Sequence, residues 1–220
     1  MKPNKTNCYV IGLTGTIAAG KSTVLTYLQE RYHARCFDCD LIARDIVNES
    51  RNEIADLFGE TVLDGETINR NALSSIVFED RQALEQLNAL IHPRVCAFVE
   101  REIAALSGEG NALAVIEAIG LLTTPLKDLC SSIWVVSASP EVRIERMLKT
   151  RGMTREEAIN RIRSQWDDET FRAKADVVIQ TDAGSLDAMR SQVDQALERD
   201  YPSILSGQPK NQASAETGNL

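Results

Sequence analysis

Four near-continuous apolar runs along the chain predict buried β-strands. They are CYVIGL at 8–13, ALAVIEAI at 112–119, SIWVV at 132–136 and ADVVIQ at 175–180. The runs are rich in Val, Ile and Leu and do not alternate apolar with polar positions, which is the pattern of parallel strands that are covered on both faces. ARCFD at 34–38 is a weaker fifth candidate for the same sheet.

Patterns typical of helices lie between these runs. They cover residues 21–32, 41–48, about 139–149 and 186–199. Ser139 and Pro140 provide an N-cap residue and a first-turn proline, and TREE at 154–157 is a capping box that opens a further helix. The alternation of strands and helices predicts an α/β fold in three layers, doubly wound around a mainly five-stranded parallel sheet.

The segment between the second and third predicted strands is too long for one crossover connection. It contains only helical patterns, among them NEIADLFG and RQALEQLNALIHPRVCAFVEREIAAL, in which Pro93 is expected to kink or restart the helix. We therefore predict a helical insertion that projects from the sheet. The expected boundaries are 7–40 and 111–200 for the core, 41–110 for the insertion and 202–220 for a disordered polar tail.

The composition is that of an ordinary globular protein. It argues against a membrane-spanning protein and against a nucleic-acid binder. Apolar residues make up 43% and charged residues 25% of the 220 positions, and no stretch approaches the roughly 20 apolar residues that cross a bilayer. The net charge of −8 argues against a dedicated nucleic-acid binder. The run at 8–13 leads directly into a glycine-containing loop, so we interpret it as a core strand and not as a signal peptide. We expect a cytoplasmic protein that acts as a monomer.

Five scattered cysteines do not form the pattern of a disulfide framework. Cys36 and Cys39 form a C-x-x-C, and His33 precedes Cys36 by three residues. A structural zinc site needs a second ligand pair at matching spacing, and a redox C-x-x-C usually opens a helix. Neither pattern is evident, because this pair lies across a predicted strand and turn. We interpret the cysteines as small buried thiols.

Residues 15–22 fit the pattern G-x-x-x-x-G-K-[ST] of a phosphate-binding loop. The loop follows a predicted strand and precedes a predicted helix, so its backbone N–H groups and the helix dipole would face an anion. Lys21 would add a positive charge toward the outer phosphates, and the Ser22 hydroxyl would ligate Mg²⁺. The sequence therefore predicts a nucleoside triphosphate with Mg²⁺ as the ligand.

A second cluster of polar residues predicts an acceptor site. The chain has no N-K-x-D motif that would read a base in a GTP switch. The segment FDCDLIARDIV places Asp38 and Asp40 at the carboxyl end of a predicted strand, where ligands bind in open α/β sheets. One of these carboxylates can accept the proton of an acceptor hydroxyl, or hold the water shell of the metal, as a small-molecule kinase needs. Asp40 can instead be the N-cap of the helix that follows.

Six segments occur in a characteristic order. They are IGLTG…GKST (11–23), FDCDLIAR (37–44), LNALIHPRV (87–95), S-P-E-x-x-x-x-R (139–146), RIRSQ (161–165) and ADVVI (175–179). With this combination, from about Val10 to Val193, the chain resembles the dephospho-CoA kinase family. The resemblance implies a P-loop kinase fold in which the insertion binds substrate and residues of about 143–172 form a helical lid.

The resemblance also implies an activity and a set of site residues. The implied reaction is ATP-dependent phosphorylation of the ribose 3′-hydroxyl of dephospho-coenzyme A, the last step of coenzyme A biosynthesis. Asp40 would be the general base, Lys21 would contact the β- and γ-phosphates, and Arg146 would be the lid arginine that neutralises the transferred group. The implied ATP-binding residues are Gly15, Ala18, Ala19, Gly20, Lys21, Ser22, Thr23 and Arg146, with Ser22 as the Mg²⁺ ligand. The implied substrate-binding residues are Asp38, Asp40, Arg44, His92, Arg94 and Gln165. His92 has an alternative role as a helix-terminus residue with a satisfied ring.

Four threonines mark departures from the family pattern. They are Thr16 in the loop, Thr123 in place of an expected carboxylate, Thr150 in place of a second lid arginine and Thr181 in place of an asparagine. Glu117 lies six residues before Thr123, and Arg151 follows Thr150. Thr16, Ala18 and Ala19 are expected to keep negative φ. The departures leave two alternatives open, another small-metabolite or nucleotide kinase and a catalytically silent nucleotide-binding regulator.

Overall fold

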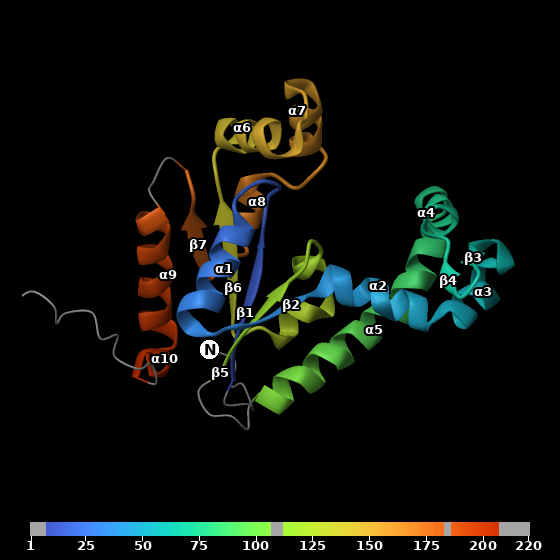
Figure 1. Ribbon diagram of the computed structural model, residues 1–220, viewed down its shortest axis with the longest axis horizontal. Coiled ribbons are helices and arrows are strands. Elements are labelled where there is room, and N and C mark those ends of the chain that lie inside the picture. Colours follow the sequence, from blue (N-terminus) through green and yellow to red (C-terminus); the bar gives the residue numbers. More distant parts are fainter. Residues whose placement is uncertain (1–7, 107–111, 183–185, 207–220) are drawn as a thin grey trace, which may run out of the picture.

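A five-stranded parallel sheet forms the centre of the molecule (Figure 1). The computed structural model describes residues 8–106, 112–182 and 186–206. The strands are β1 (Cys8–Gly15), β2 (Arg35–Asp38), β5 (Ala112–Glu117), β6 (Ser132–Ser137) and β7 (Val177–Gln180). Their order in the sheet is β2-β5-β1-β6-β7, and every neighbouring pair is parallel. The predicted α/β fold with five parallel strands is confirmed, and the weak candidate at 34–38 is one of the strands.

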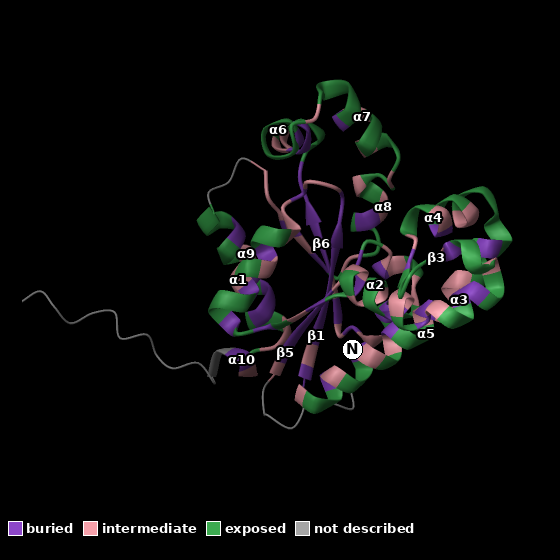
Figure 2. Ribbon diagram, turned by 45° about the vertical axis from the view of Figure 1, so that its right-hand side comes forward, coloured by how far each residue is buried: buried purple, intermediate pink, exposed green. Residues whose placement is uncertain are grey.

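Alternate residues of each strand enter two separate cores, because successive side chains in a strand point to opposite faces. Val10 and Ile116 lie in one buried cluster, whereas Ile11 and Val115 lie in the other. Helix α5 (Arg81–Leu106) packs on the first face, and α1 (Lys21–Tyr32) and α9 (Leu186–Asp200) pack on the second. Figure 2 shows the sheet as the buried centre of the fold. The three-layer arrangement follows from strands that are apolar on both sides.

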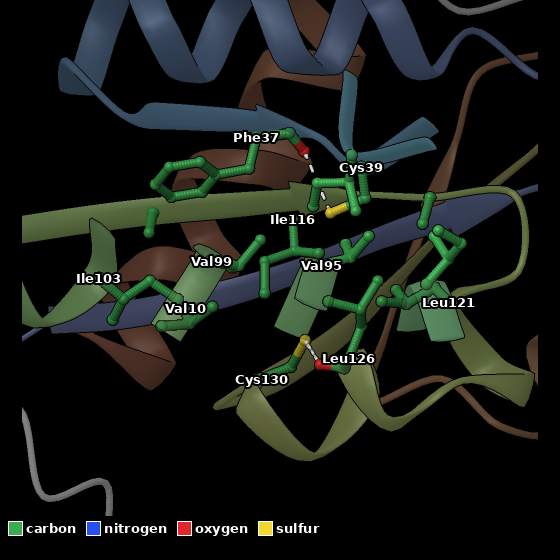
Figure 3. Close-up of a cluster of buried hydrophobic side chains, with 14 of the residues drawn as sticks. Val10, Phe37, Cys39, Val95, Val99, Ile103, Ile116, Leu121, Leu126 and Cys130 are labelled. Atoms are coloured by element: carbon green, nitrogen blue, oxygen red, sulfur yellow. Dashed lines mark hydrogen bonds between the residues drawn. The ribbon is translucent and has the colours of Figure 1, made fainter. Parts of the chain in front are cut away.

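The core beneath α5 fixes the position of the insertion relative to the sheet. Val95, Val99 and Ile103 recur every four residues on α5 and are buried against the sheet (Figure 3). This spacing places them on one face of the helix. Burying each such aliphatic side chain stabilises the fold by about 1.5–3 kcal/mol. The helix therefore holds the insertion firmly to the edge of the sheet that carries β2 and β5.

The segment between β2 and β5 is an arm that extends from the sheet (Figure 1). Its elements are α2 (Cys39–Glu49), α3 (Arg51–Phe58), η1 (Glu60–Val62), β3 (Leu63–Asp64), β4 (Thr67–Ile68), α4 (Arg70–Glu79) and α5. The prediction of only helical structure here was wrong, because β3 and β4 form a small antiparallel hairpin. Asp64 pairs with Thr67, so Gly65 and Glu66 form the loop, and Gly65 has a left-handed φ of 61° that favours glycine. Helix α5 continues through Pro93 and does not restart there.

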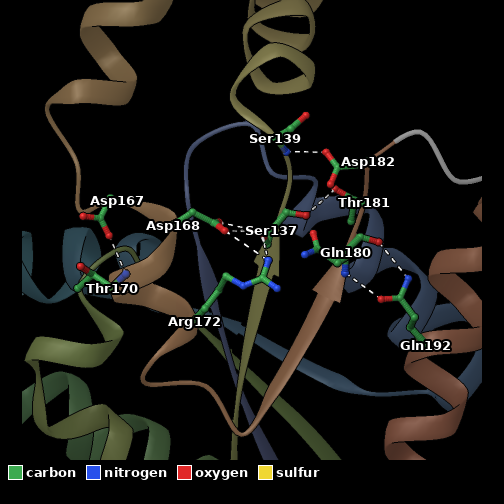
Figure 4. A network of polar contacts seen from close by, with 10 residues as sticks. All are labelled: Ser137, Ser139, Asp167, Asp168, Thr170, Arg172, Gln180, Thr181, Asp182 and Gln192. Carbon is green, nitrogen blue, oxygen red and sulfur yellow. Dashed lines mark hydrogen bonds and ion pairs between the residues drawn. The ribbon is translucent and has the colours of Figure 1, made fainter.

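Three short helices project above the carboxyl ends of β6 and β7. They are α6 (Pro140–Arg151), α7 (Arg155–Arg163) and α8 (Asp168–Arg172). The capping box of Thr154 and Glu157 is confirmed, but the Ser139 side chain makes no capping hydrogen bond. Ser137 joins α8 to β6, because its hydroxyl donates to the Asp168 carboxylate at 2.7 Å and accepts from Arg172 at 3.3 Å (Figure 4).

The chain after α9 differs from the expected tail at its start. Ser203–Ser206 form the short helix α10, and Ile204 is buried against the core on the α9 side of the sheet. Residues 207–220 of the predicted disordered tail lie outside the described residues.

Two short 3₁₀ helices, η3 (Leu121–Thr123) and η4 (Pro125–Leu129), connect β5 to β6. Within the described ranges, no helix is both long and apolar enough to span a membrane.

Candidate active site

The phosphate-binding loop connects the central strand β1 to α1. Gly15 ends β1 with a φ of 140°, and a Cβ atom there would lie 2.2 Å from the carbonyl oxygen of Val136. Gly20 is the N-cap residue of α1 and has a left-handed φ of 97°. Both positions of the sequence pattern therefore require glycine, one for close approach to β6 and one for backbone conformation.

The backbone of Ala18, in the phosphate loop, has a conformation that the sequence did not predict. Ala18 has a φ of 58°, so the prediction that it keeps negative φ was wrong. Thr16 and Ala19 are not among the described residues with positive φ, as expected for these two. The Thr16 side chain is fully buried, and its hydroxyl finds no hydrogen-bond partner within the described residues. The loop thus stores strain at Ala18, where an L-residue is less stable than glycine.

Side chains from distant segments hold the loop by its backbone. The Ile17 N–H donates to Gln165 at 2.9 Å, and the Ile17 carbonyl accepts from Arg143 Nε at 3.1 Å. Arg146 donates to the Ala18 carbonyl at 3.2 Å. Thr181 donates to the carbonyl of Ala19 and accepts from Arg146 at 3.1 Å. The root of the lid and the end of β7 therefore fix the shape of the phosphate loop.

Lys21 folds back over the loop that it follows. Its Nζ donates to the Gly15 carbonyl at 3.1 Å and to the Thr16 carbonyl at 3.3 Å. Burial lowers the pKa of the lysine, and the nearby carboxylates of Glu117 and Asp40 oppose that shift. The ammonium group thus lies between the phosphate loop and a group of carboxylates.

One side of the loop opens into a cavity of about 430 Å³. Five of the predicted ATP-binding residues line it, namely Ala18, Gly20, Ser22, Thr23 and Arg146. Thr150, Arg151 and Thr181 line the same cavity, so two of the unusual threonines lie at this site. The Thr150 hydroxyl donates to the Arg146 carbonyl at 2.6 Å, and the next residue, Arg151, brings a second cation to the cavity.

Asp38 and Asp40 have different roles at the other side of the loop. Asp38 is the N-cap of α2, because its carboxylate accepts from the Leu41 N–H at 2.9 Å. Asp40 lies in the first turn of the helix, so its interpretation as the cap was wrong. Burial raises the pKa of Asp40, and a hydrogen bond from the Ile119 backbone together with the cations of Arg44 and Lys21 opposes the rise.

Glu117 is a site residue to which the sequence analysis gave no role. It ends β5 and lies opposite Asp38 in β2 and Leu13 in β1. Burial raises the pKa of Glu117, Lys21 lowers it, and Asp38 and Asp40 raise it further. The apolar run ALAVIE ends in this acidic residue, and carboxyl ends of central strands are where ligands bind. That signal was present in the sequence.

A smaller cavity of about 190 Å³ lies between the sheet edge and the arm. It is lined by Asp40, Ala43, His92, Val95, Ala118 and Gly120, among other residues. His92 belongs to the interior of α5, so the alternative of a helix-terminus residue was wrong.

Arg94 lies elsewhere. It pairs with Glu53 at 2.7 Å and donates to Ser50, within the arm. Residues two positions apart on a helix do not share a face, which explains why His92 and Arg94 separate.

All five cysteines lie in the described part of the chain, and none of them forms a disulfide there. Burial raises the pKa of Cys39 to about 12 and that of Cys36 to about 11. Cys39 is buried and Cys36 is half-buried. The described residues hold no cluster of three His, Cys, Asp or Glu side chains suited to a metal ion. The prediction of buried thiols therefore holds for Cys8, Cys39 and Cys130, whereas Cys36 and Cys96 are half-buried.

The sequence and fold were compared with those of known proteins. The family model described as "Dephospho-CoA kinase" matches residues 9–187. A dephospho-CoA kinase of Carboxydothermus hydrogenoformans is 38% identical over 189 residues, which cover 84% of this chain and 90% of that protein. A dephospho-CoA kinase of Synechocystis sp. is 39% identical and covers 77% of this chain and 86% of its own length.

Solved structures give the same picture of the fold. The protein TT1252 of Thermus thermophilus matches with a TM-score of 0.75 at 28% identity, over 88% of this chain and 97% of that one. A dephospho-CoA kinase from Campylobacter jejuni matches with a TM-score of 0.57 at 23% identity over 88% of this chain and 97% of its own, and bears on the fold alone. With a family model that spans most of its length, the chain belongs to the dephospho-CoA kinase family.

Proposed function

We propose that this protein transfers the γ-phosphoryl group of ATP to the ribose 3′-hydroxyl of dephospho-coenzyme A. The observation that carries the proposal is the placement of Asp40 and Lys21. Asp40 lines the cavity of about 190 Å³, which we take as the acceptor site, and Lys21 lies on the phosphate loop. The charge of each side chain shifts the pKa of the other. A reacting hydroxyl and a phosphoryl group need such a pair, one group to take the proton and one to stabilise the transferred charge.

The proposed reaction requires no covalent bond between the protein and the transferred group. Phosphoryl transfer depends mainly on positioning and on charge neutralisation. The loop N–H groups, Lys21 and Arg146 would bind the phosphates of ATP. Asp40 would accept the proton of the acceptor hydroxyl. The lid of α6, α7 and α8 would exclude water, since an exposed phosphate loop would otherwise let ATP hydrolyse.

The residues present fit a Mg²⁺ ion held together with ATP. Mg²⁺ usually keeps several waters and takes one or two protein ligands beside the phosphates. Ser22 lies in the first turn of α1 and lines the cavity of about 430 Å³, which suits a hydroxyl ligand. Bound there, the ion would neutralise charge on the phosphates. Asp40 and Glu117 would hydrogen-bond to its waters from the acceptor side.

The helical arm at 41–110 is the part that we assign to acceptor binding. His92 reaches the same cavity as Asp40, and Arg44 is close enough to act on the Asp40 carboxylate. Asp38 caps helix α2, and Gln165 supports the phosphate loop by accepting from the Ile17 N–H. The proposal includes a cytoplasmic, monomeric enzyme. The net charge of −8 argues against a nucleic-acid partner.

A coupled assay of ADP release tests the proposal. The purified protein with ATP and Mg²⁺ should release ADP rapidly with dephospho-coenzyme A and slowly without an acceptor. Nucleoside monophosphates, added singly at the same concentration, serve as competing acceptors. Turnover of a monophosphate in the absence of turnover of dephospho-coenzyme A would replace this proposal with a nucleotide kinase. ATP binding without transfer to any acceptor would indicate a silent regulator.

A further inference from the structure

A third hollow lies between the loop after β5 and the carboxyl end of the lid. Its volume is about 280 Å³. Ile119, Leu122 and Thr123 line it from the loop after β5, and Gln165, Trp166 and Phe171 line it from the lid. It is separate from the cavity that contains Ser22, Thr23 and Arg146, because the two have no lining residue in common.

The hollow adjoins both the proposed base and the phosphate loop. The Ile119 backbone N–H acts on the Asp40 carboxylate and lowers its pKa, and Ile119 also lines the hollow. Gly120 lines this hollow and also the cavity that contains Asp40 and His92. Gln165 lines the hollow and accepts from the Ile17 N–H of the phosphate loop. A molecule in the hollow would therefore contact Ile119 and Gly120, the two residues that connect the hollow to Asp40 and its cavity.

The walls of the hollow suit a flat, weakly polar ligand. Two large apolar side chains stay accessible here, Ile119 with 74% and Trp166 with 42% of its surface exposed. The Phe171 ring lies 5.7 Å from the Trp166 ring, and the Lys174 ammonium lies 6.0 Å from the Trp166 ring centre. An indole that is half open beside an aliphatic wall is a surface on which a nucleobase stacks. The cavity around Asp40 has no aromatic side chain apart from the His92 imidazole among its described lining residues.

We propose that this hollow binds the adenine base of the acceptor, stacked against Trp166. The inference rests on the proposed function, since it assigns one part of the same acceptor. The base and the 3′-hydroxyl are attached to one ribose ring, so a hydroxyl at Asp40 requires the base in an adjoining space. The hollow is the adjoining space with an exposed aromatic face. The 5′ arm of the acceptor would then leave toward the cavity of Asp40 and His92.

Tryptophan fluorescence provides a direct test, because the two tryptophans differ in exposure. Trp134 is fully buried and Trp166 is 42% exposed. Dephospho-coenzyme A and 5′-AMP should each quench the emission of the wild type, and the Trp166→Phe variant should lose that quenching. The 4′-phosphopantetheine arm alone should not quench. Quenching by the arm and not by 5′-AMP would assign the hollow to the arm and overturn the proposal.

Steady-state kinetics give the second readout. Trp166→Ala should raise the KM for dephospho-coenzyme A about 5- to 150-fold, as expected when one base loses a stacking partner. The KM for ATP should stay within about twofold, and Trp166→Phe should retain most of the acceptor affinity. Trp166→Phe keeps an aromatic face at the same position and is therefore the matched control. An unchanged acceptor KM in an active Trp166→Ala enzyme would overturn this inference alone, whereas a wild type inactive toward dephospho-coenzyme A would overturn the proposed function.

Discussion

The two sides of the phosphate loop are built by different physical means. On the side of the larger cavity, backbone groups of Ile17, Ala18 and Ala19 are each bound by a side chain from the lid or from β7. On the acceptor side, Asp40 and Glu117 lie at the ends of the sheet and interact with Lys21 through charge. One side is shaped by directed hydrogen bonds, and the other is defined by electrostatic potential.

We expect the first side to determine how tightly ATP binds and the second side to determine the rate of phosphoryl transfer. A loop that is already shaped loses little conformational freedom when a nucleotide binds, so damage to its supports should appear as weaker nucleotide binding. Half-buried carboxylates of raised pKa keep their proton to a higher pH than exposed carboxylates do, which suits a group that accepts and releases a proton. Damage on the acceptor side should therefore appear in kcat. Substitutions on each side test whether the two functions separate in this way.

Replacement of the proposed base should have the largest effect. Asp40→Asn removes the proton acceptor and keeps the shape of the side chain, so kcat should fall about 10²- to 10⁴-fold. The KM for ATP should remain within about twofold, because the phosphate loop is unchanged. Asp45→Asn removes the same charge from an exposed position of α2 and is the matched control. A fall in both variants would point to the charge of α2 and not to a base.

The pH dependence of kcat/KM should report the environment of Asp40. Burial raises its pKa above the ordinary 3.8, and a general base acts only when it is deprotonated. The rate should therefore fall with decreasing pH through an apparent pKa above that of a free aspartate. Asp38 and Glu117 interact with Asp40, and so do the cations of Arg44 and Lys21.

Arg44→Ala sharpens this prediction, because it removes a cation that lowers the pKa of Asp40. The acid limb should move to higher pH in this variant. Arg81→Ala, which removes an arginine with 92% of its side chain exposed, should leave the limb in place. An acid limb that moves to lower pH in Arg44→Ala would contradict the assignment of the limb to Asp40.

Loss of one support of the phosphate loop should have a moderate effect on the other side. Thr181→Val removes the hydroxyl that joins the Ala19 carbonyl to Arg146. The hydrogen bonds lost are worth about 1–3 kcal/mol together, so the KM for ATP should rise about 5- to 150-fold, with kcat less affected. Thr181→Ser keeps the hydroxyl and should behave like the wild type. An equal loss in both variants would show that the hydroxyl alone does not support the loop, and a loss confined to Thr181→Ser would assign the effect to the methyl group.

Much of this fold could be predicted from the sequence because its strands are buried on both faces. The runs at 8–13 and 132–136 show the required apolar continuity, and both are central or next to central in the sheet. The hairpin of β3 and β4 was missed because each strand has two residues, too few for any periodicity. The restart expected at Pro93 was wrong, because α5 runs unbroken from Arg81 to Leu106 with buried residues on both sides of the proline.

The local sequence predicted the phosphate loop but not the side chains that support it. Arg143 is separated from its partner Ile17 by 126 positions, and Thr181 is separated from Ala19 by 162. Such partners depend on how α6 and β7 pack, which no local pattern contains. The roles assigned to Asp40, His92 and Arg146 stay predictions, although Asp40 and His92 do line one cavity.

The smallest expected effect concerns the strain at Ala18. An alanine with left-handed φ costs about 1–2 kcal/mol, and glycine removes that cost but gains entropy when unfolded, by about 0.5–1 kcal/mol. Ala18→Gly should therefore raise the free energy of unfolding slightly, by about 0.5 kcal/mol. Ala19→Gly, at a buried position without positive φ, should lower it instead. Urea unfolding of the two variants, compared at equal m-value, measures both changes in the free energy of unfolding. If both variants lose stability equally, the left-handed backbone at Ala18 costs the fold nothing, and the loop is shaped by its hydrogen bonds without residual strain.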